Sequence, residues 1–273
     1  MNTLVKRSLT GLLFVVILTG SVLLSPYTFG ALFLIISLIG TYEFYKSFVM
    51  GEEVYPQKFA SLFVAGVIFI IFFLEASGFL PYRYLSLLFL VFPVLFFIEL
   101  YRKYPNPLGN LASSVAGIIY VVVPFAILNY IVFGTSHSHQ YHPLILMALF
   151  ILIWTNDTGA YIVGMTIGKH RMIPRISPNK TWEGTIGGIL FTLILAYLLA
   201  SHFQGLSKIQ VLGFAFITSI SSIFGDLIES LLKRSVGIKD SGNILPGHGG
   251  ILDRFDSLLV AAPTIFVYLQ LIS

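Results

Sequence analysis

The sequence predicts an all-α protein, a polytopic transmembrane helix bundle of about nine spans. Three observations lead to this prediction. The chain of 273 residues is 56% hydrophobic and only 10% charged, with a mean hydropathy of +0.90, whereas soluble domains are about a quarter charged. Its apolar residues form runs long enough to cross ~30 Å of hydrocarbon as helices. Its basic residues collect between alternate runs, as the positive-inside rule requires.

Each apolar run is expected to form one span. The first follows Lys6 and Arg7 and resembles a signal peptide, but no small-x-small cleavage site follows it, so we interpret it as an uncleaved helix. We divide the chain into a five-span region, 1–142, and a four-span catalytic region, 143–273, with no soluble domain. The predicted spans are 9–24, 28–48, 59–78, 81–101, 111–133, 143–168, 184–203, 209–232 and 251–272.

Nine spans place the termini on opposite sides, and the basic residues decide which side is which. With the N-terminus cytoplasmic and the C-terminus outside, every Lys and Arg except Arg83 and Lys208 lies on the cytoplasmic face. This predicts a multi-pass membrane protein with most of its charged connections on the cytoplasmic side. We expect the membrane to be a bacterial inner membrane and the site to lie on that side. Because this topology accounts for the basic residues and for the pI of 9.2, we expect no nucleic-acid partner.

Two cytoplasmic connections, 169–183 and 235–250, are more than turns. Pro174, Pro178 and Pro246 preclude regular helix in them. Irregular backbone near membrane depth is tolerated where it packs on protein or lines a polar cavity. The absence of Cys excludes thiolate chemistry and Cys-based zinc sites. The two connections are therefore expected to border a site built from carboxylate, His and hydroxyl groups.

The eighth span carries one polar stripe. Spacings of three and four place Ser219, Ser222, Asp226, Ser230 and Lys233 on the same helix face. An isolated stripe of this kind can be a structural contact between helices. Ionisable groups within a membrane more often mark a substrate or ion site, because each costs ~2.5–3.5 kcal/mol to insert.

Further carboxylates are predicted beside this stripe. Asp253 and Asp256 lie three residues apart at the start of the last span, and Asp157 interrupts the sixth. Carboxylates converging from neighbouring helices would repel one another without a cation. Oxygen-only ligands suit Mg²⁺, which takes one or two carboxylates together with water and substrate phosphates.

Basic residues and glycines are interleaved with these carboxylates. Glycines at 247, 249 and 250 would let backbone N–H groups approach an anion, which favours a phosphate site. Each basic residue alone can also be a topology signal or a contact to anionic lipid. The basic residues concerned are Lys180, Lys233, Arg234, Lys239 and Arg254.

Residues 230–256 carry these groups in the pattern S-x2-K-R-x4-K-D-x-G-x2-L-P-x-H-G-G-x2-D-R-x-D. This pattern closely resembles the signature of the phosphatidate cytidylyltransferases, the CDP-diacylglycerol synthases. The blocks NDTGAY at 156–161 and ISPNKTWEG at 176–184 also look like blocks of that family. The resemblance covers about 154–256, and the first five spans match only in hydropathy and count.

The resemblance implies transfer of a cytidylyl group from CTP to phosphatidic acid drawn from the bilayer, within a layer of membrane lipid. It implies Mg²⁺ as cofactor, and it leaves open a second, monovalent cation and a homodimer. The implied metal ligands are Asp226, Asp253 and Asp256.

The other implied site residues act on phosphates or the nucleotide. Asp157 is either a ligand or a carboxylate behind the ligands, and Asp240 either acts in catalysis or holds the loop in shape. The implied catalytic residues are Asp226, Lys233, Arg234, Lys239, Asp240, His248, Asp253, Arg254 and Asp256. The implied substrate-binding residues are Asp157, Ser177, Lys180, Trp182, Ser230, Gly249 and Gly250.

Two other functions fit an intramembrane carboxylate site. A cation- or proton-coupled transporter would need a polar path across the whole membrane, whereas the predicted charges crowd the inner side. Another transferase, acting on a polyprenyl phosphate, would fit the chemistry but not the signature.

Overall fold

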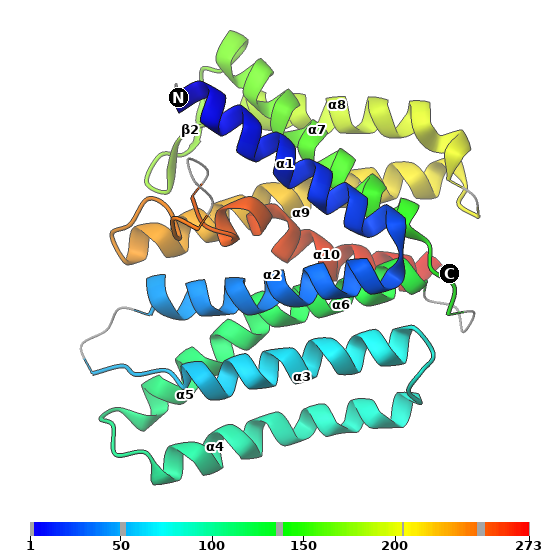
Figure 1. Ribbon diagram of the computed structural model, residues 1–273. Coiled ribbons are helices and arrows are strands. Elements are labelled where there is room, and N and C mark those ends of the chain that lie inside the picture. Colours follow the sequence, from blue (N-terminus) through cyan, green and yellow to red (C-terminus); the bar gives the residue numbers. More distant parts are fainter. Residues whose placement is uncertain (1–2, 50–52, 135–138, 204, 245–248, 273) are drawn as a thin grey trace.

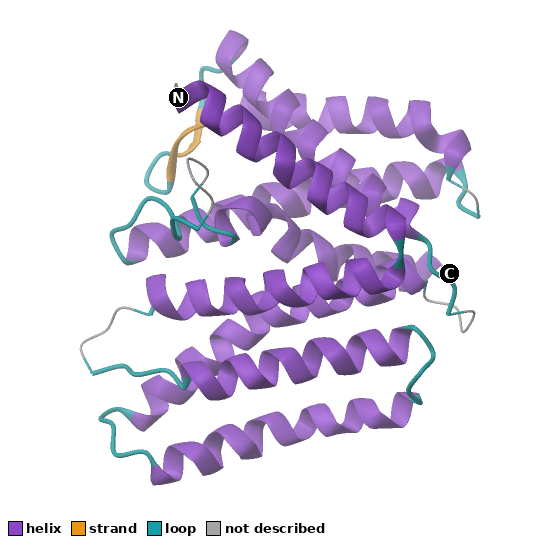
Figure 2. Cartoon of the chain, viewed as in Figure 1, coloured by secondary structure: helices purple, strands orange, loops and turns teal. Residues whose placement is uncertain are grey.

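The computed structural model of the chain is a bundle of long helices, as predicted, with one short β-hairpin (Figure 2). It describes residues 3–49, 53–134, 139–203, 205–244 and 249–272. The elements of the first half are α1 (Thr3–Leu24), α2 (Pro26–Ser47), α3 (Lys58–Ala76), the 3-10 helix η1 (Tyr82–Leu90), α4 (Val91–Tyr101), α5 (Pro107–Gly117), the π-helical segment η2 (Ile118–Val122) and α6 (Val123–Phe133). Those of the second half are α7 (Pro143–Ile167), β1 (Arg171–Ile173), β2 (Ser177–Thr181), α8 (Trp182–Leu199), the 3-10 helix η3 (Ala200–His202), α9 (Lys208–Ser235) and α10 (Leu252–Ile272).

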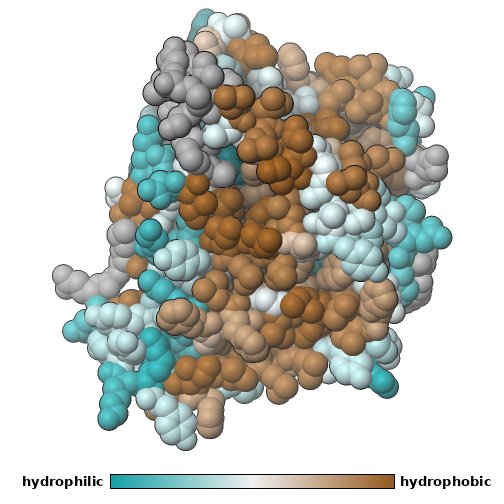
Figure 3. Space-filling view, in the orientation of Figure 1, coloured by the Kyte–Doolittle hydropathy of each residue, from teal (hydrophilic) through white to brown (hydrophobic). Residues whose placement is uncertain are grey.

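The predicted spans each correspond to a helix or a continuous helical segment. In the part of the chain that the structure describes, eight such segments are long and apolar enough to cross a membrane, and Leu9–Leu24 of α1 forms a shorter ninth candidate. The space-filling view shows apolar surface across the middle of one face, with hydrophilic residues toward both ends (Figure 3). This distribution is that of a multi-pass membrane protein.

The helix ends follow local sequence signals. Ser25 accepts a hydrogen bond from the backbone N–H of Thr28, and Thr28 in turn accepts one from the backbone N–H of Ser25, which forms a capping box before Pro26. Ser207 and Gln210 form a second capping box at the start of α9. These caps pair backbone donors that the first helical turn leaves unpaired.

The fifth span is widened in its middle. From Ile118 to Val122 the backbone is π-helical, and the N–H of Val123 bonds to the carbonyl of Ile118. Pro124 follows directly. Because proline lacks a backbone N–H and its ring crowds the preceding turn, the α-helical pattern is interrupted at this point.

Most of the basic residues lie at one end of the helix bundle. In Figure 1 the connections α2–α3, α4–α5, α7–α8 and α9–α10 lie at one end of the helices, and the start of α1 and the end of α10 lie at opposite ends. The basic residues from Lys46 onward fall at that same end, except Arg83 and Lys208. We call it the basic end. The charge separation matches the predicted topology, and the assignment of the basic end to the cytoplasm stays a prediction.

Glycines let the helices of the second half approach closely. A Cβ on Gly188 would lie 2.6 Å from the carbonyl oxygen of Asn156, and one on Gly184 would lie 2.7 Å from that of Ala160, so α7 and α8 pack backbone to backbone. Gly225 plays the same part between α9 and α10, where a Cβ would lie 2.5 Å from the carbonyl oxygen of Asp256. This packing brings α7, α8, α9 and α10 together around the candidate site.

The predicted division at residue 142 is not visible as a gap in packing. α10 packs against α6 and α2 of the first half as well as against α9. The division into a five-span and a four-span region therefore stays a prediction.

Candidate functional site

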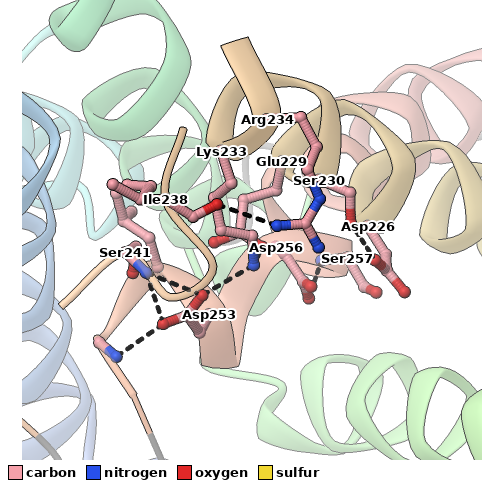
Figure 4. Close-up of polar contacts among 12 residues, drawn as sticks. Asp226, Glu229, Ser230, Lys233, Arg234, Ile238, Ser241, Asp253, Asp256 and Ser257 are labelled. Carbon is pink, nitrogen blue, oxygen red and sulfur yellow. Dashed lines mark hydrogen bonds and ion pairs between the residues drawn. The ribbon is translucent and has the colours of Figure 1, made fainter. Parts of the chain in front are cut away.

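The part of the polar stripe labelled in Figure 4, which is Asp226, Ser230 and Lys233 of α9, lies beside Asp253 and Asp256 at the start of α10. Ser230 donates a hydrogen bond of 3.2 Å to Oδ1 of Asp226, one turn before it. Ser219 and Ser222, further along the stripe, bond to carbonyls of their own helix. The charged part of the stripe therefore begins at Asp226.

Lys233 lies between two carboxylates. Its Nζ is 2.7 Å from Oε2 of Glu229 and 2.8 Å from Oδ1 of Asp253. The side chain of Lys233 is 12% exposed, and those of Glu229 and Asp253 are 0% and 5% exposed. In this arrangement Lys233 neutralises buried carboxylates. It does not point into open space, where a substrate phosphate would lie.

Asp253 also holds the loop between α9 and α10. Its Oδ2 accepts hydrogen bonds from the backbone N–H groups of Ser241, at 2.9 Å, and Gly250, at 2.7 Å. A Cβ on Gly249, whose φ is +81°, would lie 2.5 Å from the same oxygen. The two oxygens of Asp253 are thus engaged by Lys233 and by the loop backbone.

Lys180 reaches the site from the hairpin. Its Nζ lies 2.6 Å from Oδ2 of Asp226, and both side chains are partly exposed. β1 and β2 pair antiparallel, with Arg171 opposite Thr181. The Thr181 hydroxyl then caps α8 by accepting from the N–H of Gly184. The sequence correctly excluded regular helix in this connection, but the expectation of irregular backbone was wrong, because residues 171–181 form an antiparallel strand pair.

Glu183 anchors the start of the hairpin. It accepts hydrogen bonds from the backbone N–H groups of Lys169 and His170, and its Oε1 lies 2.5 Å from Nδ1 of His170. These contacts fix the base of the strand pair that carries Lys180.

Two cavities are lined in part by the same carboxylates, Asp157 and Asp226. The first, about 310 Å³, is lined by the carboxylates Asp157, Asp226, Asp253 and Asp256 together with Arg254, and also by residues of α1, namely Thr10, Gly11, Phe14 and Val15. The second, about 760 Å³, lies among α7, α8 and the hairpin. Asp157 and Asp226 line both. Lining residues of the second cavity include Asn156, Asn179, Lys180, Arg171, Thr181 and Thr185.

Asp256 faces the first cavity from α10. Its Oδ1 accepts a 2.6 Å hydrogen bond from the backbone N–H of Ser257. The Ser257 hydroxyl donates to the carbonyl of Ser222 on α9, at 3.3 Å. These contacts and the close approach at Gly225 bring Asp256 beside Asp226 at the wall of one cavity.

The other predicted residues lie at the edge of this cluster. Arg234 donates to the carbonyl of Ile238 and so closes the end of α9, while Lys239 and Asp240 are exposed on the loop. Ser177 begins β2, and Trp182, 51% exposed, begins α8. His248 lies outside the described residues.

The carboxylates supply oxygen donors that suit a metal ion, but they do not lie close enough together to form a metal site by themselves. Within the described ranges, no three His, Asp or Glu side chains lie close enough together to hold a metal ion. Mg²⁺ nevertheless needs only one or two carboxylates when water and substrate phosphates complete its shell. Asp226 and Asp256 line the first cavity with hard oxygen donors. The donor set fits a hard divalent cation.

Sequence reasoning assigned no role to two buried carboxylates of this region. Glu229 lies four residues before Lys233, and the favourable Glu–Lys spacing on a helix was a readable signal. Glu43 of α2 accepts hydrogen bonds from the loop that leads into α10. A lone acidic residue within an apolar span was its only signal.

The sequence of the chain is similar to those of known proteins. The model of the cytidylyltransferase family matches residues 5–272. A phosphatidate cytidylyltransferase of Bacillus subtilis is 49% identical over 128 residues, which cover 45% of this chain and 46% of that protein. That of Haemophilus influenzae is 44% identical over 135 residues, which cover 46% of this chain and 46% of that protein. That of Staphylococcus aureus is 44% identical over 149 residues, which cover 54% of this chain and 56% of that protein. The aligned segments thus span about half the length of these curated relatives.

Proposed function

The chain belongs to the cytidylyltransferase family, and from this membership we propose that it transfers the cytidylyl group of CTP to phosphatidic acid, giving CDP-diacylglycerol and pyrophosphate. The structural observation that supports the proposal is the pair of cavities at the basic end, which share Asp157 and Asp226. Two substrates can approach such a shared wall from different sides. The curated relatives named above support phosphatidate as the acceptor.

The reaction requires neutralisation of phosphate charge more than it requires a strong general base. A phosphate monoester has a second pKa of about 6 and is largely ionised near neutral pH. Its oxygen can attack the α-phosphorus of CTP once the repulsion between the two polyanions is relieved. Fixed cations, a metal ion and alignment of the reacting groups meet this need.

We assign the larger cavity to the nucleotide. It is bordered by amide, hydroxyl and basic side chains, including Asn179, Lys180 and Arg171, which suit a base, a ribose and phosphates. The hairpin that carries Lys180 is anchored by Glu183. Ser177 and Trp182, at the two ends of the same segment, stay in our nucleotide set.

We assign the smaller cavity to the lipid phosphate. Apolar residues of α1, among them Phe14 and Val15, line it together with Arg254 and the carboxylates. A diacylglycerol chain can pack on such a helix while its phosphate stays near Arg254. The exposed side chain of Arg254 makes it our first choice for a phosphate contact, ahead of Lys233, which is engaged by Glu229 and Asp253.

A divalent cation, for which we propose Mg²⁺, would be held by Asp226 and Asp256, with Asp157 beside them. When bound it would neutralise phosphate charge and stabilise the leaving pyrophosphate. Asp253 was predicted as a direct ligand. It lines the same cavity as Asp226 and Asp256, so it stays in the proposed ligand set. Because its oxygens also accept hydrogen bonds from Lys233 and the loop, we assign it in addition to holding the loop in place.

The chain's own residues prepare the site. Lys180 pairs with Asp226 and so limits the repulsion among the carboxylates. Gly249 and Gly250 keep the backbone close to Asp253, which fixes the start of α10. We propose that this site opens on the cytoplasmic side of a bacterial inner membrane, where CTP is available.

An acceptor-choice assay tests the proposal. Detergent-purified protein is given CTP labelled at the α-phosphate, with phosphatidate, undecaprenyl phosphate or no acceptor. We expect a labelled lipid and pyrophosphate with phosphatidate alone, and no labelled lipid from the Asp226→Asn variant purified in parallel. Label on the polyprenyl phosphate, or pyrophosphate release without an acceptor lipid, would overturn the assignment.

A further inference from the structure

Glu43 of α2 contacts the described ends of the connection between α9 and α10. It is 2% exposed. Its carboxylate accepts hydrogen bonds from the backbone N–H of Ile251, at 2.8 Å, from that of Leu252, at 3.1 Å, and from the hydroxyl of Ser241. One side chain therefore contacts both the beginning and the end of the segment 241–252.

Ser241 joins Glu43 to the carboxylate on the other side of the loop. Its hydroxyl donates to Glu43, while its backbone N–H donates to Asp253, at 2.9 Å. Gly250 is also held by Asp253 through its N–H. The described ends of the loop are thus fixed between one carboxylate from α2 and one from α10.

The space around Glu43 explains two glycines of the motif. A Cβ on Gly242 would lie 2.9 Å from Cδ of Glu43, and a Cβ on Gly250 would overlap its Oε1. Neither glycine can carry a side chain unless Glu43 moves. Only Gly249 has a positive φ among the three motif glycines at 242, 249 and 250. Close approach to Glu43 is therefore the reason for glycine at 242, and close approach to Glu43 and to the Ser241 hydroxyl is the reason at 250.

Glu43 lies at the start of α10 and accepts a hydrogen bond from its first backbone N–H group. The first backbone N–H groups of a helix have no partner within it, and an anion near them is also favoured by the helix dipole. α10 starts at Leu252, whose N–H bonds to Glu43. Because Asp253, Arg254 and Asp256 all lie in the first turns of α10, the direction of their side chains follows from this start.

Glu99 provides a comparison within the same protein. It is another buried carboxylate near the basic end, 5% exposed, and it accepts from Arg102, Gln57 and Asn110. Its partners join α4 to α5 and to the segment before α3, away from the loop. Glu99 therefore has the burial of Glu43 but no connection to the candidate site.

We propose that Glu43 is a positioning residue for the cytidylyl transfer, which acts by holding Ser241 and the start of α10 in place. The inference rests on the proposed function. It places part of the site in the first half of the chain, where the sequence carries no signature motif.

The test compares Glu43→Gln with Glu99→Gln in two measurements on the monodisperse protein in detergent. Hydrogen exchange followed by mass spectrometry needs no substrate. We expect faster exchange in peptides covering 249–256 for Glu43→Gln, and no change there for Glu99→Gln. In the transfer assay, we expect kcat of Glu43→Gln to fall roughly tenfold or more, as for the loss of a charge-assisted contact, with KM for CTP little changed. We expect Glu99→Gln to keep the parent kcat.

Ser241→Ala supports the test if Glu43→Gln does not yield a folded protein. It removes one donor to Glu43 and leaves both carboxylates, so we expect the same direction of change with a loss of roughly two- to tenfold in kcat. Parent-like exchange in 249–256 or parent-like kcat in the folded variants would overturn the role of Glu43. If the parent itself transfers nothing to phosphatidate, the proposed function fails, while the exchange comparison still decides whether Glu43 holds the loop.

Discussion

Lys233→Met gives the sharpest test of the buried ion cluster. The substitution keeps an unbranched side chain but removes the ammonium that lies 2.7 Å from Glu229 and 2.8 Å from Asp253. Both carboxylates are then buried without their cation. Removing one partner of a buried ion pair costs about 3–5 kcal/mol. At about 2–4 °C per kcal/mol for a chain of this size, the unfolding temperature is expected to fall by roughly 6–20 °C.

The assay is thermal unfolding in detergent, followed by intrinsic fluorescence. We expect Glu229→Gln combined with Lys233→Met to recover a large part of the lost stability, because the double variant no longer buries an unpaired Glu229. Lys239→Met is the matched control. It changes an exposed lysine of the adjoining loop, and exposed substitutions usually stay within about 0.5 kcal/mol. An unchanged unfolding temperature for Lys233→Met, or a double variant less stable than the single one, would show that Lys233 does not neutralise this cluster.

The other predictions concern the cavities and the topology. Asp226→Asn and Asp256→Asn each remove a carboxylate from a crowded wall, so we expect an unfolding temperature without Mg²⁺ equal to or above that of the parent, together with turnover reduced by about a hundredfold or more. Early unfolding with normal turnover would make these residues structural. Lys180→Met breaks a partly exposed pair, so we expect stability to change by about 1 kcal/mol or less while turnover falls roughly ten- to a hundredfold. Equal losses of folded protein and turnover would refute its role at the substrate. Cys residues introduced at Ser177 and Ser235 are expected to react with an impermeant reagent only from the cytoplasmic side, and labelling of intact cells would reverse the topology.

The sequence determined the spans and the helix face on which the candidate residues of α9 lie. An apolar run of about 20 residues leaves the chain few alternatives, because a helix is the form that satisfies every backbone group within one membrane segment. The stripe of α9 was equally readable, since spacings of three and four fix which side chains share a helix face. The hydrogen bond from Ser230 to Asp226 lies on that stripe.

The partners of these residues were harder to predict. Lys233 was expected at a substrate phosphate, and it lies between Glu229 and Asp253. The contact between Lys233 and Glu229 could be predicted from local spacing, because Glu229 is one turn from Lys233. The contact between Lys233 and Asp253 depends on how α10 packs on α9, and that packing follows from the close approach at Gly225.

Only the tertiary structure decided which distant residues belong to the site. Glu43 and Glu99 look alike in the sequence, each a single acidic residue in an apolar span. The fold places Glu43 against Ser241 and the start of α10, and it places Glu99 against Arg102 and Asn110. The physical reason is that local pattern fixes the face on which a side chain lies, whereas the donors that satisfy a buried carboxylate come from whichever helix packs on that face.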